Sequence, residues 1–201
     1  MDRNRLLDLW DVTREELDEI IQANPSLRGI VFGYVAEYKL RKIWFSDQSR
    51  ITDLVKYDDH DRRKKHDVEF RYKGMLISVE VKSLQTATVK QTDQGYTGRF
   101  QCDASDRRKV TFPTGETIET TCLLAGDFDM LAVNCFQFGR KWRFAFARNK
   151  DLPRSRYTKY KPEHRQFLLA TLMDVTWPVQ PPFVDEPFRL LDQIVQEKMQ
   201  Q

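Results

Sequence analysis

The chain has 201 residues, which suits one compact domain with additions. Hydrophobic residues make up 40% of it and charged residues 31%, a balance that supports a real core and excludes wholesale disorder. No apolar run approaches the roughly 18 residues needed to cross a bilayer, and no apolar stretch after the charged N-terminus resembles a secretory signal. We therefore expect a protein without a membrane partner.

The three cysteines also exclude some classes of protein. Cys102, Cys122 and Cys135 are odd in number, widely spaced and without a C-x-x-C pair. A disulfide framework or a structural zinc knuckle is therefore not expected, and a cytoplasmic location fits best. The sequence also lacks the phosphate-binding, serine-hydrolase, zinc-protease and dinucleotide motifs of other enzyme classes.

The charge is unevenly distributed along the chain. The formal net charge is only +3, but residues 140–165 contain ten basic and two acidic residues, which leaves the rest of the chain net acidic. Such asymmetry indicates a polyanionic partner. The alternative is a basic face that is merely solvated.

In chain order, the first elements predicted are helices. Thr13 and Glu16 form a capping-box pattern ahead of a helix that ends at Asn24-Pro25. A second helix is expected over about residues 27–45, followed by a charge-rich loop over 53–65. A change to a period of two then predicts strands over 68–72 and 77–81, joined by a turn at Lys73-Gly74.

The remaining elements are predicted from apolar patterns and turn residues. Residues 85–108 are polar and are expected to form a long connecting segment without a clear helix. The later elements expected are a hairpin over 110–112 and 118–124, strands over 128–133 and 142–147, a helix over 162–172, an extended link over 177–182 and a helix over 186–198.

The first hairpin is the most informative place for chemistry. A two-residue turn at Lys73-Gly74 pairs Val68 with Val79, and the same register sets Asp67 opposite Glu80. Like charges directly opposed on a sheet are destabilising, so this pair needs a cation or a shared proton. Lys82 supplies one charge, and Mg²⁺ suits the remaining oxygen ligands better than zinc. The alternative is a longer turn from which both carboxylates reach solvent.

Two [DE]-x-K triplets occur, at Glu37 and at Glu80, and only the second lies on an apolar strand preceded by an acidic strand. A glycine-bearing helix and three later segments follow one another in the order R-G-I-V-F-G-Y-V-A-E, H-D-V-E-F, S-V-E-V-K-S and F-D-M-L-A-V. Through these segments, the sequence over about 27–147 resembles the PD-(D/E)xK nuclease superfamily. The resemblance implies an α/β fold with a restriction-endonuclease-like αβββαβ core, in which a mixed central sheet is flanked by helices. We expect a single domain, with an N-terminal helical addition (1–26), the core (27–150) and a basic, helical C-terminal addition (151–201).

The resemblance also assigns roles to individual residues. Asp67 matches the first acid of the family, Glu80 the second, Lys82 the lysine and Glu37 the additional helix acid of some members. Asp67 and Glu80, with the backbone carbonyl of Val81, would hold Mg²⁺, for which Mn²⁺ is expected to substitute. Lys82 would orient the attacking water or stabilise charge. Glu37 would bind a second metal or pair with Arg41, the reading we favour.

Several further side chains are candidates for contact with a nucleic acid. Arg107 and Arg108 lie in a segment able to read base edges, or in an ordinary polar loop. A basic stretch interleaved with Tyr157 and Tyr160 suits phosphate contacts and stacking, and its candidates are Arg154, Arg156, Lys159 and Lys161.

Other titratable residues receive structural interpretations. Asp127 and Asp129 are read as acids at the start of a strand, with a metal or DNA-facing role for Asp129 as the alternative. His60 and His66 are read as loop residues, and His164 as part of a surface helix without a role.

Together these features favour a Mg²⁺-dependent DNA endonuclease of the restriction type. The resemblance alone adds a homodimer and a cognate methyltransferase as expected partners. The alternatives are a catalytically inactive nucleic-acid-binding module of the same fold, and a nuclease that acts on branched DNA, single strands or RNA.

Overall fold

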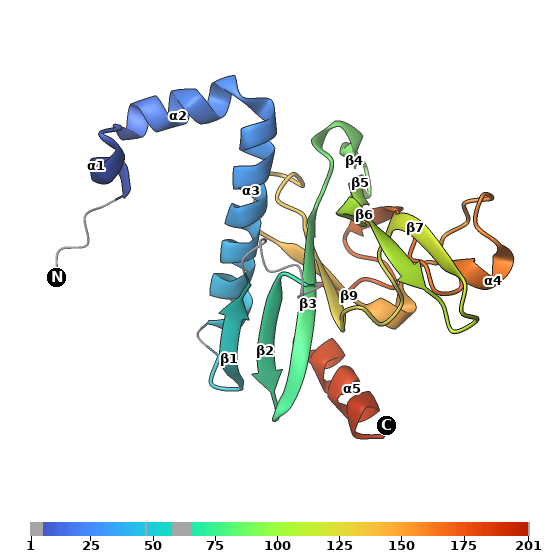
Figure 1. Cartoon of the computed structure of the whole chain (residues 1–201). Helices are drawn as coiled ribbons and strands as arrows, with labels where there is room; N and C mark the ends of the chain where they lie inside the picture. Colours follow the sequence, from blue (N-terminus) through green and yellow to red (C-terminus); the bar gives the residue numbers. More distant parts are fainter. Residues whose placement is uncertain (1–5, 47, 58–65, 201) are drawn as a thin grey trace. The chain divides into compact units, whose positions relative to one another are not determined.

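The computed structural model in Figure 1 describes residues 6–46, 48–57 and 66–200. These residues belong to two units, Met1–Ala36 and Glu37–Gln201. The expected divisions near residues 26 and 150 stay predictions. No described helix is both long and apolar enough to span a membrane.

The first unit follows the capping signals of the sequence. It contains α1 (Leu6–Trp10), α2 (Arg14–Ala23) and most of α3 (Pro25–Leu40). The Thr13 hydroxyl accepts a hydrogen bond from the Glu16 N–H at 3.1 Å, while the Glu16 carboxylate accepts one from the Thr13 N–H at 2.8 Å. The predicted capping box is therefore confirmed. A π-helical turn over 41–45 continues α3, as expected for a helix that reaches residue 45.

A five-stranded mixed sheet organises the second unit. Its order is β1-β2-β3-β8-β9, in which β3 and β8 are parallel and the other neighbours antiparallel. The strands are β1 (Ile51–Lys56), β2 (Val68–Tyr72), β3 (Met75–Ser83), β8 (Met130–Asn134) and β9 (Phe144–Arg148). With its flanking helices, this sheet gives the mixed α/β class that the sequence predicts.

The predicted β2–β3 hairpin is confirmed in its register. Val68 pairs with Val79 and Phe70 with Ile77. Lys73 and Gly74 form the turn with φ values of 50° and 81°, the positive values that a two-residue hairpin turn requires.

The central sheet separates two hydrophobic cores. Met130 and Ala132 of β8 belong to one core, with Leu191 and Ile194 of α5 (Phe188–Met199). Leu131 and Val133 point to the opposite face, into a core shared with the strands inserted between β3 and β8. One face of β3 therefore looks toward α5 and the other toward the inserted strands.

The segment between β3 and β8 contains strands instead of a crossover helix. They are β4 (Lys90–Thr92), β5 (Gly95–Gln101), β6 (Asp103–Thr111) and β7 (Thr117–Cys122). Strands β6 and β7 pair with each other, as the second predicted hairpin requires, while β5 lies between β4 and β10 (Leu172–Trp177) in a second sheet. The parallel β3–β8 pair of the expected core is thus formed through an all-β connection.

Two local predictions are wrong. A loop is expected over 53–65, but most of β1 lies there. The pairing of β1 with β2 is interrupted by a bulge near Asp53. Residues 58–65 lie outside the described part. The helix expected over 162–172 is only the short α4 (Pro162–Arg165). Leu168 and Leu169 instead form bridges with Leu124 and Arg154.

His164 is also placed differently from the prediction. Its side chain is buried, stacks on Phe112 with 4.3 Å between ring centroids, and forms a hydrogen bond with Glu116. The prediction of a surface position for this histidine is therefore wrong, because its ring packs against Phe112 and is shielded from solvent.

Candidate active site

Strand β3 presents two charged side chains on one face. Val79 belongs to the core on the α5 side and Val81 packs against it. Because side chains alternate along a strand, Glu80 and Lys82 point to the other face, toward the inserted strands. Their positions follow from the alternation that predicted the hairpin.

Asp67 lies beside these residues, just before β2. Its N–H donates to the carbonyl of Val79 at 3.1 Å, so the strand departs from regular pairing at this point. Its Oδ2 atom accepts a hydrogen bond from the N–H of Val81 at 2.7 Å. The Asp67 carboxylate is therefore fixed to β3 between Glu80 and Lys82.

The environment of Glu80 disfavours its charged form. Only 6% of the residue is exposed. Burial, followed by the negative charge of Asp67, raises the pKa of Glu80 to about 7, although Lys82 opposes the rise. The two carboxylates therefore interact across the hairpin, as predicted, and do not diverge to separate surfaces.

Lys82 is held between the acid pair and the inserted strands. Its Nζ atom lies 2.7 Å from Oε1 of Glu80 and donates to the carbonyl of Asp103 at 3.0 Å. Burial alone would lower the pKa of Lys82, but the charges of Glu80 and Asp67 outweigh burial and raise it. The side chain therefore carries its proton at neutral pH and acts as a cation.

Glu37 reaches the same end of the sheet from α3. Its carboxylate lies 3.2 Å from Nζ of Lys56, at the end of β1. Lys56 pairs with Val68, which follows Asp67. Glu37 is therefore paired with Lys56 in the described structure, and its predicted pair with Arg41 stays a prediction.

Asp67 and Glu80 suit a magnesium ion more than a transition metal. Within residues 6–46, 48–57 and 66–200, no group of three or more His, Cys, Asp or Glu side chains could hold a metal by itself. Mg²⁺ is usually bound by one or two carboxylates, with water and substrate phosphates completing its shell. Two interacting carboxylates agree with this mode of magnesium binding. The role of the Val81 carbonyl as a further ligand stays a prediction.

Arg108 belongs to the surroundings of the site. Its guanidinium lies 2.6 Å from Asp127, and its charge lowers the pKa of Glu80 against the larger effects that raise it. The Nε atom is buried and has no hydrogen-bond partner in the described structure. Arg107, the neighbouring candidate, is exposed on β6.

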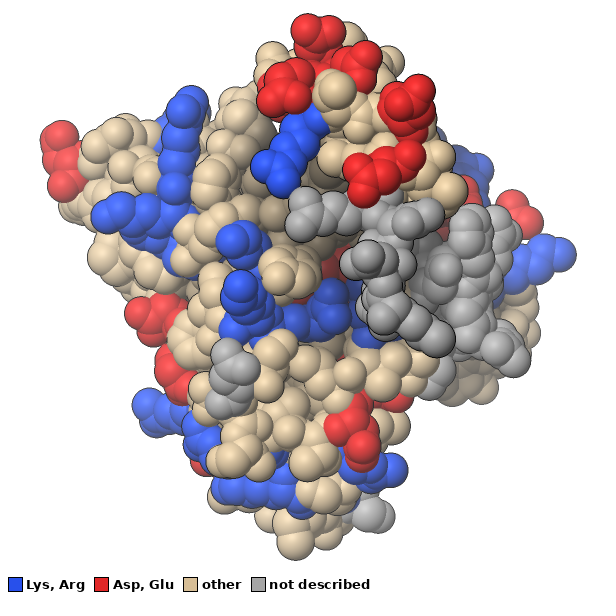
Figure 2. Space-filling view, turned by 90° about the vertical axis from the view of Figure 1, so that its left-hand side faces the viewer, with Lys and Arg blue, Asp and Glu red and all other residues tan. Residues whose placement is uncertain are grey.

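The four basic candidates near the C-terminal end have different environments. The Arg154 guanidinium donates to the carbonyls of Asn149, Lys150, Leu152 and Gln166, which gives it a structural role. Arg156 and Lys159 are exposed, whereas Lys161 forms an ion pair with Glu116. Figure 2 shows another side of the molecule, on which acidic and basic side chains lie interspersed.

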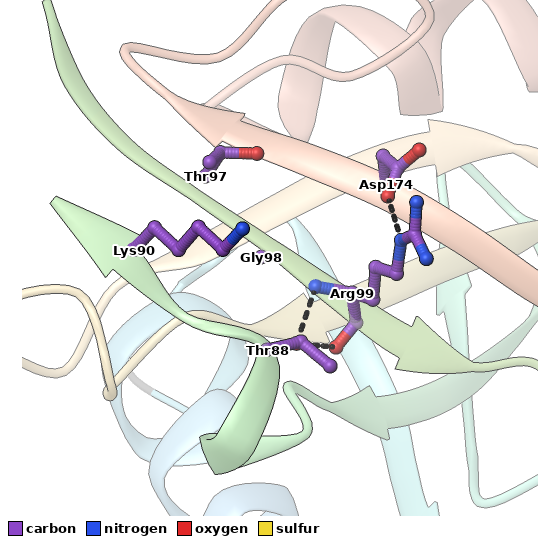
Figure 3. Close-up of a pocket in the computed structure, with 6 residues that line it drawn as sticks. All are labelled: Thr88, Lys90, Thr97, Gly98, Arg99 and Asp174. Atoms are coloured by element: carbon purple, nitrogen blue, oxygen red, sulfur yellow. Dashed lines mark hydrogen bonds and ion pairs between the residues drawn. The ribbon is translucent and has the colours of Figure 1, made fainter. Parts of the chain in front are cut away.

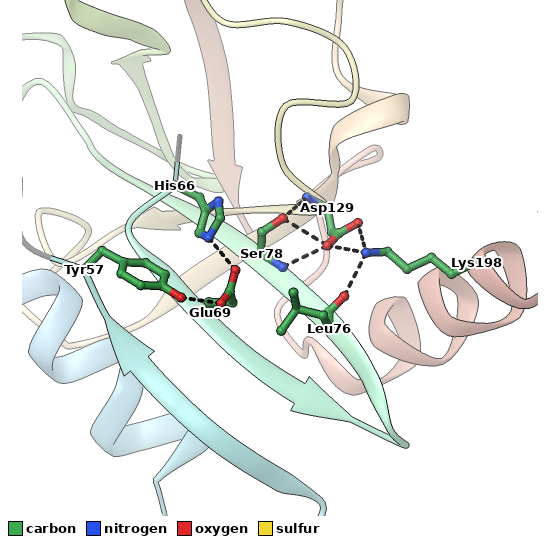
Figure 4. Close-up of polar contacts among 7 residues, drawn as sticks. All are labelled: Tyr57, His66, Glu69, Leu76, Ser78, Asp129 and Lys198. Atoms are coloured by element: carbon green, nitrogen blue, oxygen red, sulfur yellow. Dashed lines mark hydrogen bonds and ion pairs between the residues drawn. The ribbon is translucent and has the colours of Figure 1, made fainter. Parts of the chain in front are cut away.

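Two polar clusters near the hairpin were not predicted. Figure 4 shows Tyr57 and His66 on Glu69, with 3.0 Å between His66 Nε2 and Glu69 Oε2. Glu69 lies two residues after Asp67, so the alternation of side chains along a strand could have predicted that both point to the same face.

The second cluster connects β3, the start of β8 and α5. Asp129 accepts hydrogen bonds from the Ser78 backbone and from Lys198, each at 2.8 Å. Asp127 pairs with Arg108, and Asp129 fixes β3 to α5, so both acids have structural contacts; the alternative role of Asp129 stays a prediction.

Neither the models of known protein families nor the curated proteins gave a match to this chain. Among solved structures, the chain is similar to a bacterial homing endonuclease, I-Ssp6803I. The match has 17% sequence identity and a TM-score of 0.31, and it covers 68% of this chain and 85% of that chain. The α/β class of the present chain follows independently from its own strand order.

Proposed function

We propose that the chain is a Mg²⁺-dependent endonuclease that hydrolyses DNA phosphodiester bonds, of the restriction type. One observation carries the proposal: Asp67 and Glu80 interact across a β-hairpin, with the Lys82 ammonium 2.7 Å from Glu80. This is the arrangement implied by the resemblance of H-D-V-E-F and V-E-V-K to the PD-(D/E)xK superfamily.

The proposed roles follow from the chemistry of the three side chains. Asp67 and Glu80 would hold Mg²⁺, which when bound would lower the pKa of a coordinated water and neutralise charge on the phosphate. The raised pKa of Lys82 favours a charged hydrogen-bond donor over a general base. Lys82 would then stabilise negative charge on the phosphate or orient the attacking water.

Cleavage of supercoiled plasmid DNA, with and without Mg²⁺, tests this proposal. The wild type should nick or linearise the plasmid only with the metal, while Asp67→Ala should be inactive. Lys82→Ala should retain DNA binding and lose cleavage. Glu119→Gln, which removes an exposed carboxylate on β7, is the matched control and should cleave like the wild type. Equal cleavage by Lys82→Ala would remove this lysine from the mechanism.

A second candidate is a catalytically inactive nucleic-acid-binding module of the same fold. The observation that favours it is the Glu80–Lys82 ion pair, which already compensates the buried carboxylate. Calorimetric titration with Mn²⁺ separates the two candidates, because a metal site should bind the ion and lose it in Asp67→Ala. An absence of binding by the wild type would support the inactive module.

The substrate and the assembly need separate measurements. A panel of duplex, branched and single-stranded DNA and RNA identifies the preferred substrate. Light scattering coupled to gel filtration tests the homodimer that symmetric duplex sites favour.

A further inference from the structure

The sheet β10-β5-β4 has an inner apolar face and an outer polar face. Phe100 is fully buried, and a Cβ atom built on Gly98 would meet Phe138, Leu84 and Val89 within 3.3 Å. Alternation therefore directs Thr97, Arg99 and Gln101 outward. Across from them on β10 stand Thr176, Asp174 and Leu172, in register with these three positions.

A pocket of ≈ 500 Å³ opens on this outer face. Figure 3 shows its lining, to which all three strands and the turn before β4 contribute: Thr88, Lys90, Thr97, Gly98, Arg99 and Asp174. The Lys90 side chain forms no hydrogen bond or ion pair with any residue that the structure describes, and it extends toward β5. An ammonium group is therefore available for an external anion.

Arg99 is the second cation of this face. Its Nε atom lies 2.7 Å from Oδ1 of Asp174, with 54% of the Arg99 side chain and 66% of the Asp174 side chain exposed. An ion pair this exposed contributes little to stability. The guanidinium can therefore exchange the carboxylate for a phosphate with little loss of stability, because phosphate offers the same bidentate geometry.

The outer face is linked to the candidate active site through Asp103. Gln101 donates to the Asp103 carboxylate at 2.9 Å, and the carbonyl of Asp103 accepts the hydrogen bond from Lys82. Arg99 and Asp103 are four residues apart, which is about 13 Å along an extended chain. Arg99 is therefore close along the chain to the residue whose carbonyl contacts Lys82.

We propose that the outer face of β10-β5-β4 binds the backbone of duplex DNA on one side of the phosphate to be cleaved, through Lys90 and Arg99. The inference rests on the proposed function and adds a binding surface to it. Asp174 opposes binding, because its carboxylate repels phosphate and competes for Arg99.

Fluorescence anisotropy with a labelled duplex, in metal-free buffer over a series of salt concentrations, tests the surface. The double variant Lys90→Ala/Arg99→Ala should bind on the order of tenfold more weakly, and the slope of log K against log[salt] should fall by about 0.9 for each phosphate that the variant no longer neutralises. Asp174→Asn should bind more tightly than the wild type. Substitutions on one face thus shift the affinity in opposite directions.

Lys150→Ala is the matched control, because it removes an exposed, ion-paired cation from another element. It should bind DNA like the wild type, and thermal melting should show all variants folded. Unchanged affinity and salt slope in the double variant would overturn the proposal. A loss of affinity for RNA, but not for duplex DNA, would overturn it as well.

Cleavage kinetics distinguish a failure of this inference from a failure of the proposed function. With Mg²⁺, the double variant should raise KM for DNA and leave kcat near the wild-type value. If the wild type cleaves DNA and the double variant has the same KM, the proposed DNA-binding surface is wrong and the proposed nuclease activity is supported. If the wild type cleaves nothing but the double variant loses DNA binding, the nuclease is wrong while the surface stands.

Discussion

The carboxylate of Asp67 accepts a hydrogen bond from the backbone N–H of Val81, with 2.7 Å between Oδ2 and the nitrogen. A residue just outside β2 is thereby attached to the middle of the E-V-K triplet. The same carboxylate raises the pKa of Glu80. Asp67 thus combines a structural hydrogen bond with an electrostatic effect, and the two can be separated by substitution.

Asp67→Asn should preserve the hydrogen bond and remove the charge. Its amide oxygen can still accept from Val81, whereas Asp67→Ala leaves a part-buried N–H unsatisfied, which destabilises the fold by about 1–3 kcal/mol. We expect both variants to lose cleavage, and only the alanine variant to lose stability in urea unfolding. Equal stability of the two variants would contradict the role of this hydrogen bond.

Glu80 should make the metal-free protein less stable as the pH rises. Its pKa of about 7 in the folded state lies above the ordinary value of 4.5, so the native state binds more protons between these values. The stabilising contribution is full below pH 4.5 and is lost as the pH rises through 7. The size of this contribution is about 3 kcal/mol, because a difference of one in pKa corresponds to about 1.4 kcal/mol.

The pH effect can be measured by urea unfolding at about pH 5 and about pH 8 in the presence of a chelator, on either side of the raised pKa. Glu80→Gln cannot titrate, so its stability should change less between the two pH values than that of the wild type. The same pH dependence in both proteins would show that another group is responsible.

Lys82→Met should be strongly destabilising above the pKa of Glu80. The substitution removes the ammonium 2.7 Å from buried Glu80, and breaking such a pair costs about 3–5 kcal/mol. The double variant Lys82→Met/Glu80→Gln should recover part of this loss, because it buries no charge. A double-mutant cycle measures the coupling, and additive effects would show that the two side chains do not interact.

The basic residues after β9 should divide into structural and ligand-binding classes. Arg154→Ala should lower the melting temperature, because its guanidinium satisfies four backbone carbonyls. Arg156→Ala and Lys159→Ala should leave melting unchanged and weaken DNA binding, with a smaller salt dependence. Unchanged binding in both exposed variants would remove this segment from the interface.

The β2–β3 hairpin could be predicted because two local signals agree there. Alternation over Val68, Phe70 and Tyr72 identifies the strand, and Lys73-Gly74 determines the register. Asp67 lies just beyond the last regular pair of this register, and its hydrogen bond to Val81 could not be predicted from the register. The Asp103 carbonyl could not be predicted, because the hydrogen bond to Lys82 depends on how β6 returns to β3.

Other elements were missed for identifiable reasons. In β5, Gly98 occupies an inward position between Tyr96 and Phe100, and a glycine does not register as apolar. In β10, Met173 and Val175 do alternate with polar residues, but the proline at Pro162 favoured extending a helix over the preceding segment. The helix that begins at Pro162 ends early because the following residues form tertiary bridges, which local helix propensity does not predict.

The long connection between β3 and β8 also has a consequence for the order in which the candidate active site assembles during folding. The β2–β3 hairpin needs only local contacts, whereas pairing of β8 with β3 must also overcome the entropy of closing the long connection between them. The acid pair should therefore meet early, while still hydrated, and lose its water late. Pulsed hydrogen exchange during refolding should protect the amides of Phe70 and Ile77 before those of Leu131 and Val133. The opposite order would show that long-range pairing nucleates the sheet.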